Sequence, residues 1–329
     1  MSEPLLVVDN LQVSFPMKRQ RLSVKPPRLH AVAGASFAID IGETLGLVGE
    51  SGSGKSTIAR SIVGLETVTG GDIRFDGRSV TSMTRTERRA MRRDVQMVFQ
   101  DPYSSLHPRM NVIDAICEGW RNNPGVLDKR RWKPEALDIM ARVGLNPDHA
   151  TRLPNQFSGG QRQRIAIARA LALKPRMIVF DEPVSALDVS IQAQILNLLA
   201  DLQQDLNLTS LFIAHDLAVV RHVSNRINVM YLGKIAESGP GREVFNSPMH
   251  PYTRALLTAV PTMAVSENAR PSRALALQGE IPSPANPPSG CRFRTRCMFA
   301  QATCAEVEPE LKIVAPDHTA ACHFPGIAS

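Results

Sequence analysis

Short apolar runs alternate with longer helical patterns over the first 245 residues of the chain. Strand-like runs occur at TLGLVG, MIVF, SLFIA and INVMYLG, which begin at Thr44, Met177, Ser210 and Ile227. Between the second and third runs, apolar residues recur at helical spacing and form one apolar face. They are Ile191, Ile195, Leu198, Leu199, Leu202 and Leu206. Strand–helix alternation of this kind predicts an α/β domain with a largely parallel sheet.

The pattern changes at two places. DIRFDGRSV, Asp72–Val80, places an Asp-Gly pair between two strand-like halves, which predicts a β-hairpin. Near Asn246 the composition shifts to a tail that contains the proline-rich IPSPANPPSG, Ile281–Gly290, and then a group of cysteines. We therefore expect a main domain over residues 1–245 and a second over residues 246–329. The second is expected to have little regular structure and to be held together by something other than a large core.

Length and charge restrict the number of domains and the class of ligand only slightly. A chain of 329 residues suffices for two domains, and its net charge of +7 is spread along the sequence instead of gathered in one block. This favours binding of an anionic nucleotide over a nucleic-acid interface. No apolar run approaches the roughly eighteen residues that a membrane span needs, and MSEPLLVVDN lacks the pattern of a secretion signal. We expect the chain to stay in the cytoplasm, soluble or attached to another component.

A phosphate-binding loop follows the first of the strand-like runs. GESGSGKST fits the pattern G-x-x-x-x-G-K-[ST] between a strand and a helical segment. Glycines let backbone N–H groups converge on phosphate oxygens, and the following helix adds its positive end. Lys55 is expected to reach the β- and γ-phosphates, and Ser56 to bind Mg²⁺. The predicted nucleotide-binding residues are Gly49, Glu50, Ser51, Gly52, Ser53, Gly54, Lys55, Ser56 and Thr57.

Polar residues at the ends of other strands complete a candidate catalytic set. RMIVFDEP ends an apolar run in Asp181 and Glu182, whose side chains point to opposite sides and cannot do the same job. Asp181 is the candidate for holding Mg²⁺, and Glu182 for polarising the attacking water. His215 at the end of SLFIAH and Gln100 at the end of VQMVFQ are candidates for contacting the γ-phosphate.

A second glycine-containing stretch, QFSGGQRQRIAIARAL, lies at Gln156–Leu171, about a hundred residues after the phosphate loop. The order of GESGSGKST, VFQDP, FSGGQRQRIAIARAL, IVFDEPVSALD and FIAHD resembles that in the ATP-binding subunits of ABC transporters, over about residues 5–245. The resemblance implies a P-loop ATPase fold. Its parts are a RecA-like parallel sheet, an antiparallel β subdomain, and an α-helical subdomain at about residues 105–170.

The same resemblance implies roles for residues outside the phosphate loop. Ser158, Gly159, Gly160 and Gln161 match the family signature, which faces the phosphate loop of a second subunit in a head-to-tail pair. Gln100 matches the glutamine that contacts the γ-phosphate and Mg²⁺, and His215 matches the switch histidine. Asp188 ends the matching D-loop, and Phe15 matches the aromatic residue that stacks on adenine. The arginines after the signature are interpreted as the polar face of a helix.

Four of the five cysteines fall between Cys291 and Cys322, which in a cytosolic protein favours metal or redox chemistry over structural disulfides. Thiolates from Cys291, Cys297, Cys304 and Cys322 could hold a [4Fe–4S] cluster or tetrahedral zinc with a structural role. Unligated or disulfide-forming cysteines are the alternative. Arg292, Arg294 and Arg296 would offset the negative charge and favour thiolates. Cys117, among apolar neighbours, is expected to be a buried thiol.

The tail carries a narrower resemblance. SPMHPYTRALLTAVP and GEIPSPANPPSGCRFRTRC, together with PYSSLHPRM after Gln100, resemble ATPases of oligopeptide, dipeptide and nickel importers. The likeness is strongest to the second ATPase of dipeptide and oligopeptide permeases. It implies an ATP- and Mg²⁺-dependent subunit that drives peptide import at the cytoplasmic face of a bacterial membrane. The implied partners are a second, non-identical ATPase, two transmembrane permeases and an extracytoplasmic binding protein, with no nucleic acid.

Other functions are compatible with the same ATP site. The ATPase could drive import of nickel, opines or other small solutes, or peptide export. An ABC ATPase acting on nucleic acid is disfavoured, because the chain has a single cassette and no heptad series for a long coiled coil. A non-catalytic regulatory subunit would show substitutions at Glu182 or in the signature, and none is present.

Overall fold

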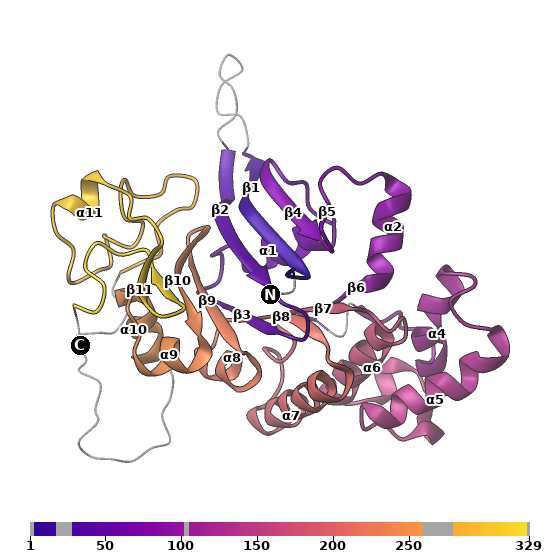
Figure 1. The fold of residues 1–329 in the computed structure, drawn as a ribbon. Coiled ribbons are helices and arrows are strands. Elements are labelled where there is room, and N and C mark those ends of the chain that lie inside the picture. Colours follow the sequence, from indigo (N-terminus) through magenta and orange to yellow (C-terminus); the bar gives the residue numbers. More distant parts are fainter. Residues whose placement is uncertain (1–2, 18–27, 102–104, 259–278, 328–329) are drawn as a thin grey trace. The chain divides into compact units, whose positions relative to one another are not determined.

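The computed structural model describes residues 3–17, 28–101, 105–258 and 279–327. The chain forms two compact units (Figure 1), and each is described by itself. The first unit comprises Met1–Asp40, Thr44–Ser82 and Ala214–Ser329, and the second comprises Ile41–Glu43 and Met83–Ile213. Parts of PYSSLHPRM and SPMHPYTRALLTAVP, residues 102–104 and 259–261, lie outside the described residues. The domain boundary at residue 245 and the helical subdomain at 105–170 remain predictions.

An antiparallel sheet in the first unit has the strand order β2-β1-β4-β5 (Figure 1). Its strands are β1 (Leu6–Pro16), β2 (Arg28–Ile39), β4 (Gly70–Phe75) and β5 (Arg78–Ser79). The predicted hairpin of β4 and β5 is confirmed: Asp76 and Gly77, with φ angles of 51° and 73°, form its turn. Both angles are positive, and Asp and Gly are residue types that tolerate this conformation well.

The strand that leads into the phosphate loop belongs to another sheet of the first unit. Here β3 (Thr44–Val48) pairs in parallel with β9 (Arg226–Tyr231), and β9 pairs antiparallel with β10 (Lys234–Pro240). All five residues of β3 are buried, as expected for an apolar central strand. The helices of this unit are α1 (Lys55–Ile62), α8 (Leu217–Val223), α9 (Gly241–Asn246), α10 (Pro251–Thr258) and α11 (Thr303–Glu306).

The tail has more regular structure than its composition predicts. Its strands β12 (His318–Ala320) and β11 (Lys312–Ala315) extend the sheet from β10 in the order β10-β12-β11. The fully buried carboxylate of Glu237 in β10 accepts hydrogen bonds from the backbone N–H groups of Met249 (2.7 Å) and His250 (2.9 Å). It also contacts Nε2 of His318 at 2.7 Å. The tail is therefore held to the sheet by backbone pairing and a buried polar centre.

In the described part of the second unit, three parallel strands lie in the order β8-β7-β6 beside a group of helices (Figure 1). The strands are β6 (Val95–Val98), β7 (Met177–Asp181) and β8 (Thr209–Ala214). The helices are α2 (Arg85–Asp94), α4 (Val112–Asn122), α5 (Trp132–Arg142), α6 (Gly159–Leu171) and α7 (Val189–Leu206). Short 3₁₀ turns lie at Lys129–Arg131, Pro147–His149 and Pro154–Gln156. The parallel pairing agrees with the strand–helix alternation of the sequence.

Burial of α7 and α6 corrects two sequence predictions. In α7, Ile195, Leu199 and Leu202 are buried as expected, but Leu206 in the last turn is 41% exposed. In α6, Arg162 was expected on a polar face, yet it is only 9% exposed because its Nε donates to the Pro154 carbonyl at 2.7 Å. That carbonyl lies in the turn before the helix, so a guanidinium can be buried there with a partner. Cys117 in α4 is buried as expected, and burial raises its pKa to about 11.

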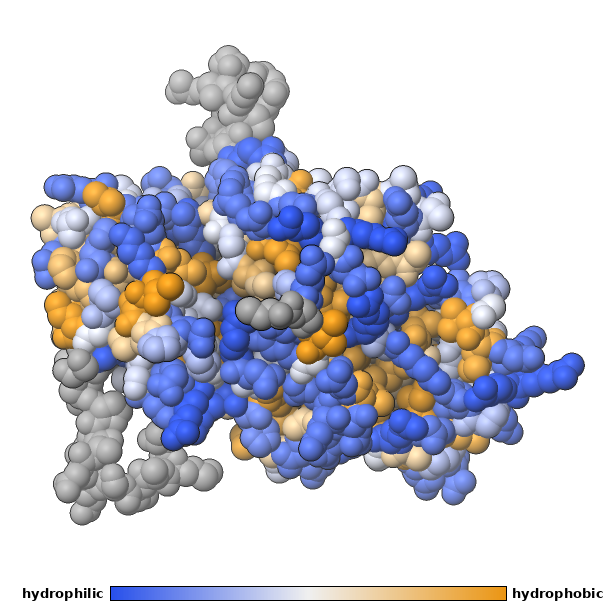
Figure 2. Space-filling view, in the orientation of Figure 1, coloured by the Kyte–Doolittle hydropathy of each residue, from blue (hydrophilic) through white to orange (hydrophobic). Residues whose placement is uncertain are grey.

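Within the described residues, no helix is both long and apolar enough to cross a membrane. On the face shown in Figure 2, apolar side chains occur in separate groups among hydrophilic ones and form no continuous belt.

Candidate functional site

The phosphate loop, residues 49–57, lies between β3 and α1 in the first unit, and its glycines are required by its shape. A Cβ at Gly49 would come within 2.1 Å of the Met230 carbonyl oxygen, and one at Gly54 within 2.3 Å of the Ala31 carbonyl oxygen. Gly52 has open space around it, but its φ of +78° disfavours other residues. Packing thus explains the outer glycines, and backbone conformation explains the middle one.

Lys55 begins α1 and is only 3% exposed. Its ammonium donates hydrogen bonds to the carbonyl oxygens of Gly49 (2.7 Å) and Glu50 (2.9 Å), so the positive charge lies within the curl of the loop. Ser56 and Thr57, both half-buried, occupy the first turn of α1. The lysine charge and the positive end of the helix therefore act together on any anion that the loop binds.

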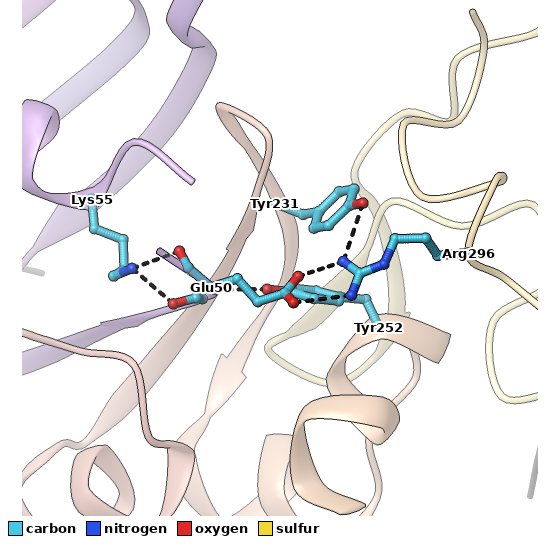
Figure 3. A network of polar contacts seen from close by, with 6 residues as sticks. Glu50, Lys55, Tyr231, Tyr252 and Arg296 are labelled. Carbon is cyan, nitrogen blue, oxygen red and sulfur yellow. Dashed lines mark hydrogen bonds and ion pairs between the residues drawn. The ribbon is translucent and has the colours of Figure 1, made fainter. Parts of the chain in front are cut away.

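The side chain of Glu50 points away from Lys55 and is bound by the tail (Figure 3). Its carboxylate forms a two-pronged ion pair with Arg296, with distances of 2.6 Å to Nη1 and 3.0 Å to Nη2. Its backbone N–H donates to the hydroxyl of Tyr252 at 2.9 Å. Arg296 and Tyr252 were not predicted from the sequence, because 246 and 202 residues separate them from Glu50 and no local pattern marks the pair.

Two other predicted nucleotide-contacting residues of the first unit are at least partly exposed. Phe15 in β1 pairs with Leu29 of β2 and is half-buried, so part of its ring is accessible for stacking. His215 is exposed and stands directly before Asp216, the residue that caps α8. Both positions are compatible with the predicted contacts to a nucleotide.

In the second unit, the structure brings Gln100 and Glu182 together. Gln100 Nε2 donates to the Glu182 carboxylate at 2.9 Å, and Ser185 Oγ donates to the Glu182 carbonyl oxygen at 3.1 Å. Glu182 has a φ of 49°, and its N–H donates to the Ile213 carbonyl oxygen at 3.0 Å. Asp181, one residue earlier, is only 2% exposed. The two adjacent acids thus have different surroundings, because Asp181 ends β7 whereas Glu182 follows the strand in a left-handed backbone conformation.

The signature residues form the start of α6 in the second unit. Ser158 caps the helix: its Oγ accepts from the N–H of Gln161 (3.3 Å), and the Gln161 side chain accepts from the N–H of Ser158 (3.0 Å). Gly159 is half-buried, and Ser158 and Gln161 are exposed. A Cβ at Gly160 would lie 2.4 Å from Cγ2 of Ile191 in α7, so this glycine allows the two helices to approach closely. Asp188, also exposed, precedes α7 as its N-cap.

The four tail cysteines surround one small cavity of about 20 Å³ in the first unit. Cys291, Cys297, Cys304 and Cys322 all line it, although they are as far apart as 31 positions in the sequence. Among the residues that the structure describes, however, no three His, Cys, Asp or Glu side chains are arranged to hold a metal ion. The cysteines are therefore neighbours without the closed geometry of a metal centre.

The arginines beside the cysteines do not balance thiolate charge as the sequence suggested. Arg296 is paired with Glu50, Arg292 contacts the Leu232 carbonyl oxygen and Glu308, and Arg294 donates to the Ser289 carbonyl oxygen. Burial raises the pKa of three of the four thiols. They are those of Cys291, Cys297 and Cys322, and the pKa of Cys322 is raised to about 11. Desolvation disfavours the charged form, so burial opposes thiolate formation at these three cysteines.

Comparisons with known proteins agree with this architecture. A family model described as "ABC transporter" matches residues 32–185, and one described as "Oligopeptide/dipeptide transporter, C-terminal region" matches residues 236–304. The chain is 48% identical to the oligopeptide transport ATP-binding protein AppF of Bacillus subtilis (strain 168) over 98% of each chain. It is 49% identical to the oligopeptide transport ATP-binding protein OppF of Escherichia coli (strain K12), covering 94% of this chain and 92% of that protein.

A solved structure resembles the ATPase part. The dimeric post-hydrolysis structure of the ATP-binding cassette MJ0796 bound to ADP and Pi is 29% identical, with a TM-score of 0.64. The alignment covers 72% of this chain and 99% of that one. These similarities confirm the predicted fold class and family.

Proposed function

This chain belongs to the ATP-binding subunits of ABC transporters, in the branch with the oligopeptide/dipeptide transporter C-terminal region, and we propose that it hydrolyses ATP to drive peptide import. The observation that carries the proposal is the near-full-length similarity to oligopeptide transport ATP-binding proteins. The curled phosphate loop around Lys55 supports the ATPase part independently. The assignment of peptide as the transported substrate rests on the similarity to oligopeptide transport proteins and on the match of the C-terminal region.

For nucleotide binding, we assign the phosphates to the N–H groups of residues 49–57 and to Lys55. These groups present positive charge from one side of the loop, which suits a triphosphate. Phe15 stacks on the base, a contact typically worth about 1–3 kcal/mol. Oxygen donors of Ser56, Gln100 and Asp181 suit a hard cation and would hold Mg²⁺. When bound, Mg²⁺ neutralises part of the phosphate charge.

For hydrolysis, Glu182 polarises the attacking water. Its hydrogen bond from Gln100 orients the carboxylate, and a carboxylate can accept a proton from the attacking water. His215 contacts the γ-phosphate from the end of β8. The different surroundings of Asp181 and Glu182 support their separate roles.

The signature predicts a second ATP-binding subunit. Ser158, Gly159 and Gly160 present the positive end of α6, with Ser158 and Gln161 exposed, so they can receive a phosphate held by another subunit. Asp188 is likewise exposed and is the N-cap residue of α7. We propose a non-identical ATPase as this partner, in a complex with two permease subunits and an extracytoplasmic binding protein. The complex would place the chain at the cytoplasmic face of the bacterial cell membrane.

We also propose that the four tail cysteines bind a [4Fe–4S] cluster or zinc. Four sulfur donors around one cavity suit either group, and their clustering supports the proposal. The described geometry is not that of a closed metal site, so binding requires the cysteine loops to adjust and the thiols to lose protons. The metal would be structural, joining segments that lack a large core of their own.

The function is tested in cells that lack this gene. Complementation with the wild-type gene should restore growth on dipeptides as sole nitrogen source, whereas Lys55→Ala should not. Growth on ammonium is the control and should not differ. Normal peptide growth without the gene would contradict peptide import. If nickel or opine uptake fell instead, the same ATPase would serve that solute.

A further inference from the structure

The tail contacts Glu50 of the phosphate loop from two directions. Arg296 holds the carboxylate with both terminal nitrogens, and the Tyr252 hydroxyl accepts from the backbone N–H of the same residue. The Arg296 side chain is only 4% exposed and that of Glu50 19% exposed, so solvent competes weakly for this pair. A paired, desolvated arginine–carboxylate contact of this geometry is among the stronger polar interactions in proteins.

Aromatic packing fixes Arg296 and Tyr252 in place. Tyr231 and Tyr252 have ring centroids 4.6 Å apart, and Phe293 lies 5.3 Å from each of them. The Arg296 guanidinium lies 5.9 Å from the centre of the Tyr231 ring. Hydrogen bonding to Glu50 raises the pKa of Arg296, so the guanidinium is charged at any physiological pH. The tail thus presents a rigid, positively charged clamp.

The clamped residue is coupled to the phosphate-binding lysine. The carbonyl oxygen of Glu50 accepts from Lys55 Nζ at 2.9 Å and from the N–H of Ser53 at 3.2 Å. Figure 3 shows the order of these contacts, from Arg296 through Glu50 to Lys55. A shift of Glu50 would therefore move both the lysine and the loop N–H groups. Loss of Arg296 would also leave a carboxylate unpaired beside a site for a polyanion.

We propose that Arg296 is a positioning residue of the ATP site, which acts through Glu50 to preorganise the phosphate loop and to neutralise its carboxylate. This rests on the proposed ATPase function. It gives the C-terminal extension a role in nucleotide affinity. ATP affinity, rather than the chemical step, is the quantity it controls, because Arg296 acts through a residue of the phosphate-binding loop.

The test measures ATP dissociation constants for the full chain by equilibrium titration, and kcat and KM for the transporter complex. Arg296→Gln should weaken ATP binding about tenfold, the usual size of a lost charge-assisted contact. KM should rise in parallel while kcat at saturating ATP stays within about twofold. Arg296→Lys keeps the charge without the paired geometry and should recover part of the affinity. Arg294→Gln is the matched control, because Arg294 lies two residues away and contacts Ser289 instead.

A double-mutant cycle tests whether Arg296 affects ATP affinity through Glu50. If Arg296 acts through Glu50, Arg296→Gln should have no further effect on ATP affinity in a Glu50→Gln background. The same fold loss in both backgrounds, or unchanged affinity in Arg296→Gln, would overturn the proposal. Should Arg296→Gln fail to fold, Arg296→Lys is compared in the same two backgrounds with the same criteria. Failure of the wild-type chain to bind ATP would instead contradict the proposed function.

Discussion

At the scale of single residues, the two acids after the MIVF run show how the end of a strand gives adjacent carboxylates different surroundings. Asp181 is buried at the end of β7, whereas Glu182 is half-buried, has a positive φ and is held by Gln100. The sequence indicated that adjacent acids take different roles. The hydrogen bond from Gln100 adds that a neutral donor orients the carboxylate of Glu182.

Replacement of Glu182 by Gln should abolish turnover but keep ATP binding. The amide has nearly the same shape but cannot accept a proton, so kcat should fall by about 100-fold or more. Without hydrolysis, the ATP-bound pair of subunits should stay closed. ATPase assays and size-exclusion chromatography of the complex with ATP measure both effects. Hydrolysis at the wild-type rate would rule out Glu182 as the base.

Gly160→Ala should destabilise the second unit. The added Cβ would lie 2.4 Å from the Ile191 side chain, so α6 and α7 would have to move apart. Overpacking of this kind typically costs about 1–3 kcal/mol. Thermal unfolding should show a lower midpoint than for Gly159→Ala, whose Cβ would lie 3.2 Å from Leu187. Equal midpoints for the two variants would contradict the packing argument.

At the scale of elements, the start of α6 has two functions: its residues cap the helix, and they form the family signature. Ser158 and Gln161 cap the helix reciprocally, so the signature needs no nucleotide to be ordered. The sequence resemblance supplied the role of this segment, and the structure supplies the reason for its residue types.

Ser158→Arg should block hydrolysis by the assembled pair without weakening ATP binding to the isolated chain. The bulky side chain would obstruct the exposed start of α6, where the second subunit's nucleotide is expected, and leave residues 49–57 unchanged. Binding titrations on the isolated chain and ATPase assays on the complex separate the two effects. Loss of binding by the isolated chain would mean that the signature acts on its own nucleotide.

The stability of the folded chain should decrease in acid because of His250, which lies where β10 meets the tail. Burial lowers the pKa of His250 to about 4 against its ordinary value of 6.5, although nearby Glu237 opposes the shift. The unfolded chain therefore binds a proton that the folded chain excludes. Stability is full above pH 6.5 and falls as the pH drops towards 4, by at most about 3 kcal/mol.

His250→Asn removes this titration and keeps an acceptor for the N–H of Tyr252, which His250 Nδ1 accepts at 3.0 Å. The difference in unfolding midpoint between wild type and variant should narrow from pH 7 to pH 4. Glu237 and His318 are present in both proteins, so the comparison isolates the change at His250. A constant difference across this range would show that His250 does not carry the effect.

At the scale of the whole molecule, the tail is joined to the ATPase part by a sheet, a buried polar centre and the clamp on Glu50. Within the tail, the four cysteines bring segments from Cys291 to Cys322 around one cavity.

Anaerobic purification followed by iron, sulfide and zinc analysis should find about one cluster or one zinc ion per chain. Cys304→Ser should reduce the metal content and lower the thermal stability, because one of four ligands is lost. Cys117→Ser is the matched control, since Cys117 lies in α4 and does not line the cavity. Absence of iron, sulfide and zinc from the wild-type protein would exclude the metal proposal.

Local patterns in the sequence determined the phosphate loop, the strand-end acids, the hairpin at Asp76-Gly77 and the family. Each depends on residues close together in the chain, whose spacing fixes the backbone and therefore the chemistry. The resemblance of the tail likewise needed only residue order.

Only the tertiary structure decided which groups meet across long separations. It assigned Arg296 to Glu50, 246 residues away in the chain, and not to the cysteines. The charge or apolarity of a side chain is visible in the sequence, but its partner depends on how segments more than a hundred residues apart pack together. For Arg296, that packing converts a residue of the tail into a support for the phosphate loop.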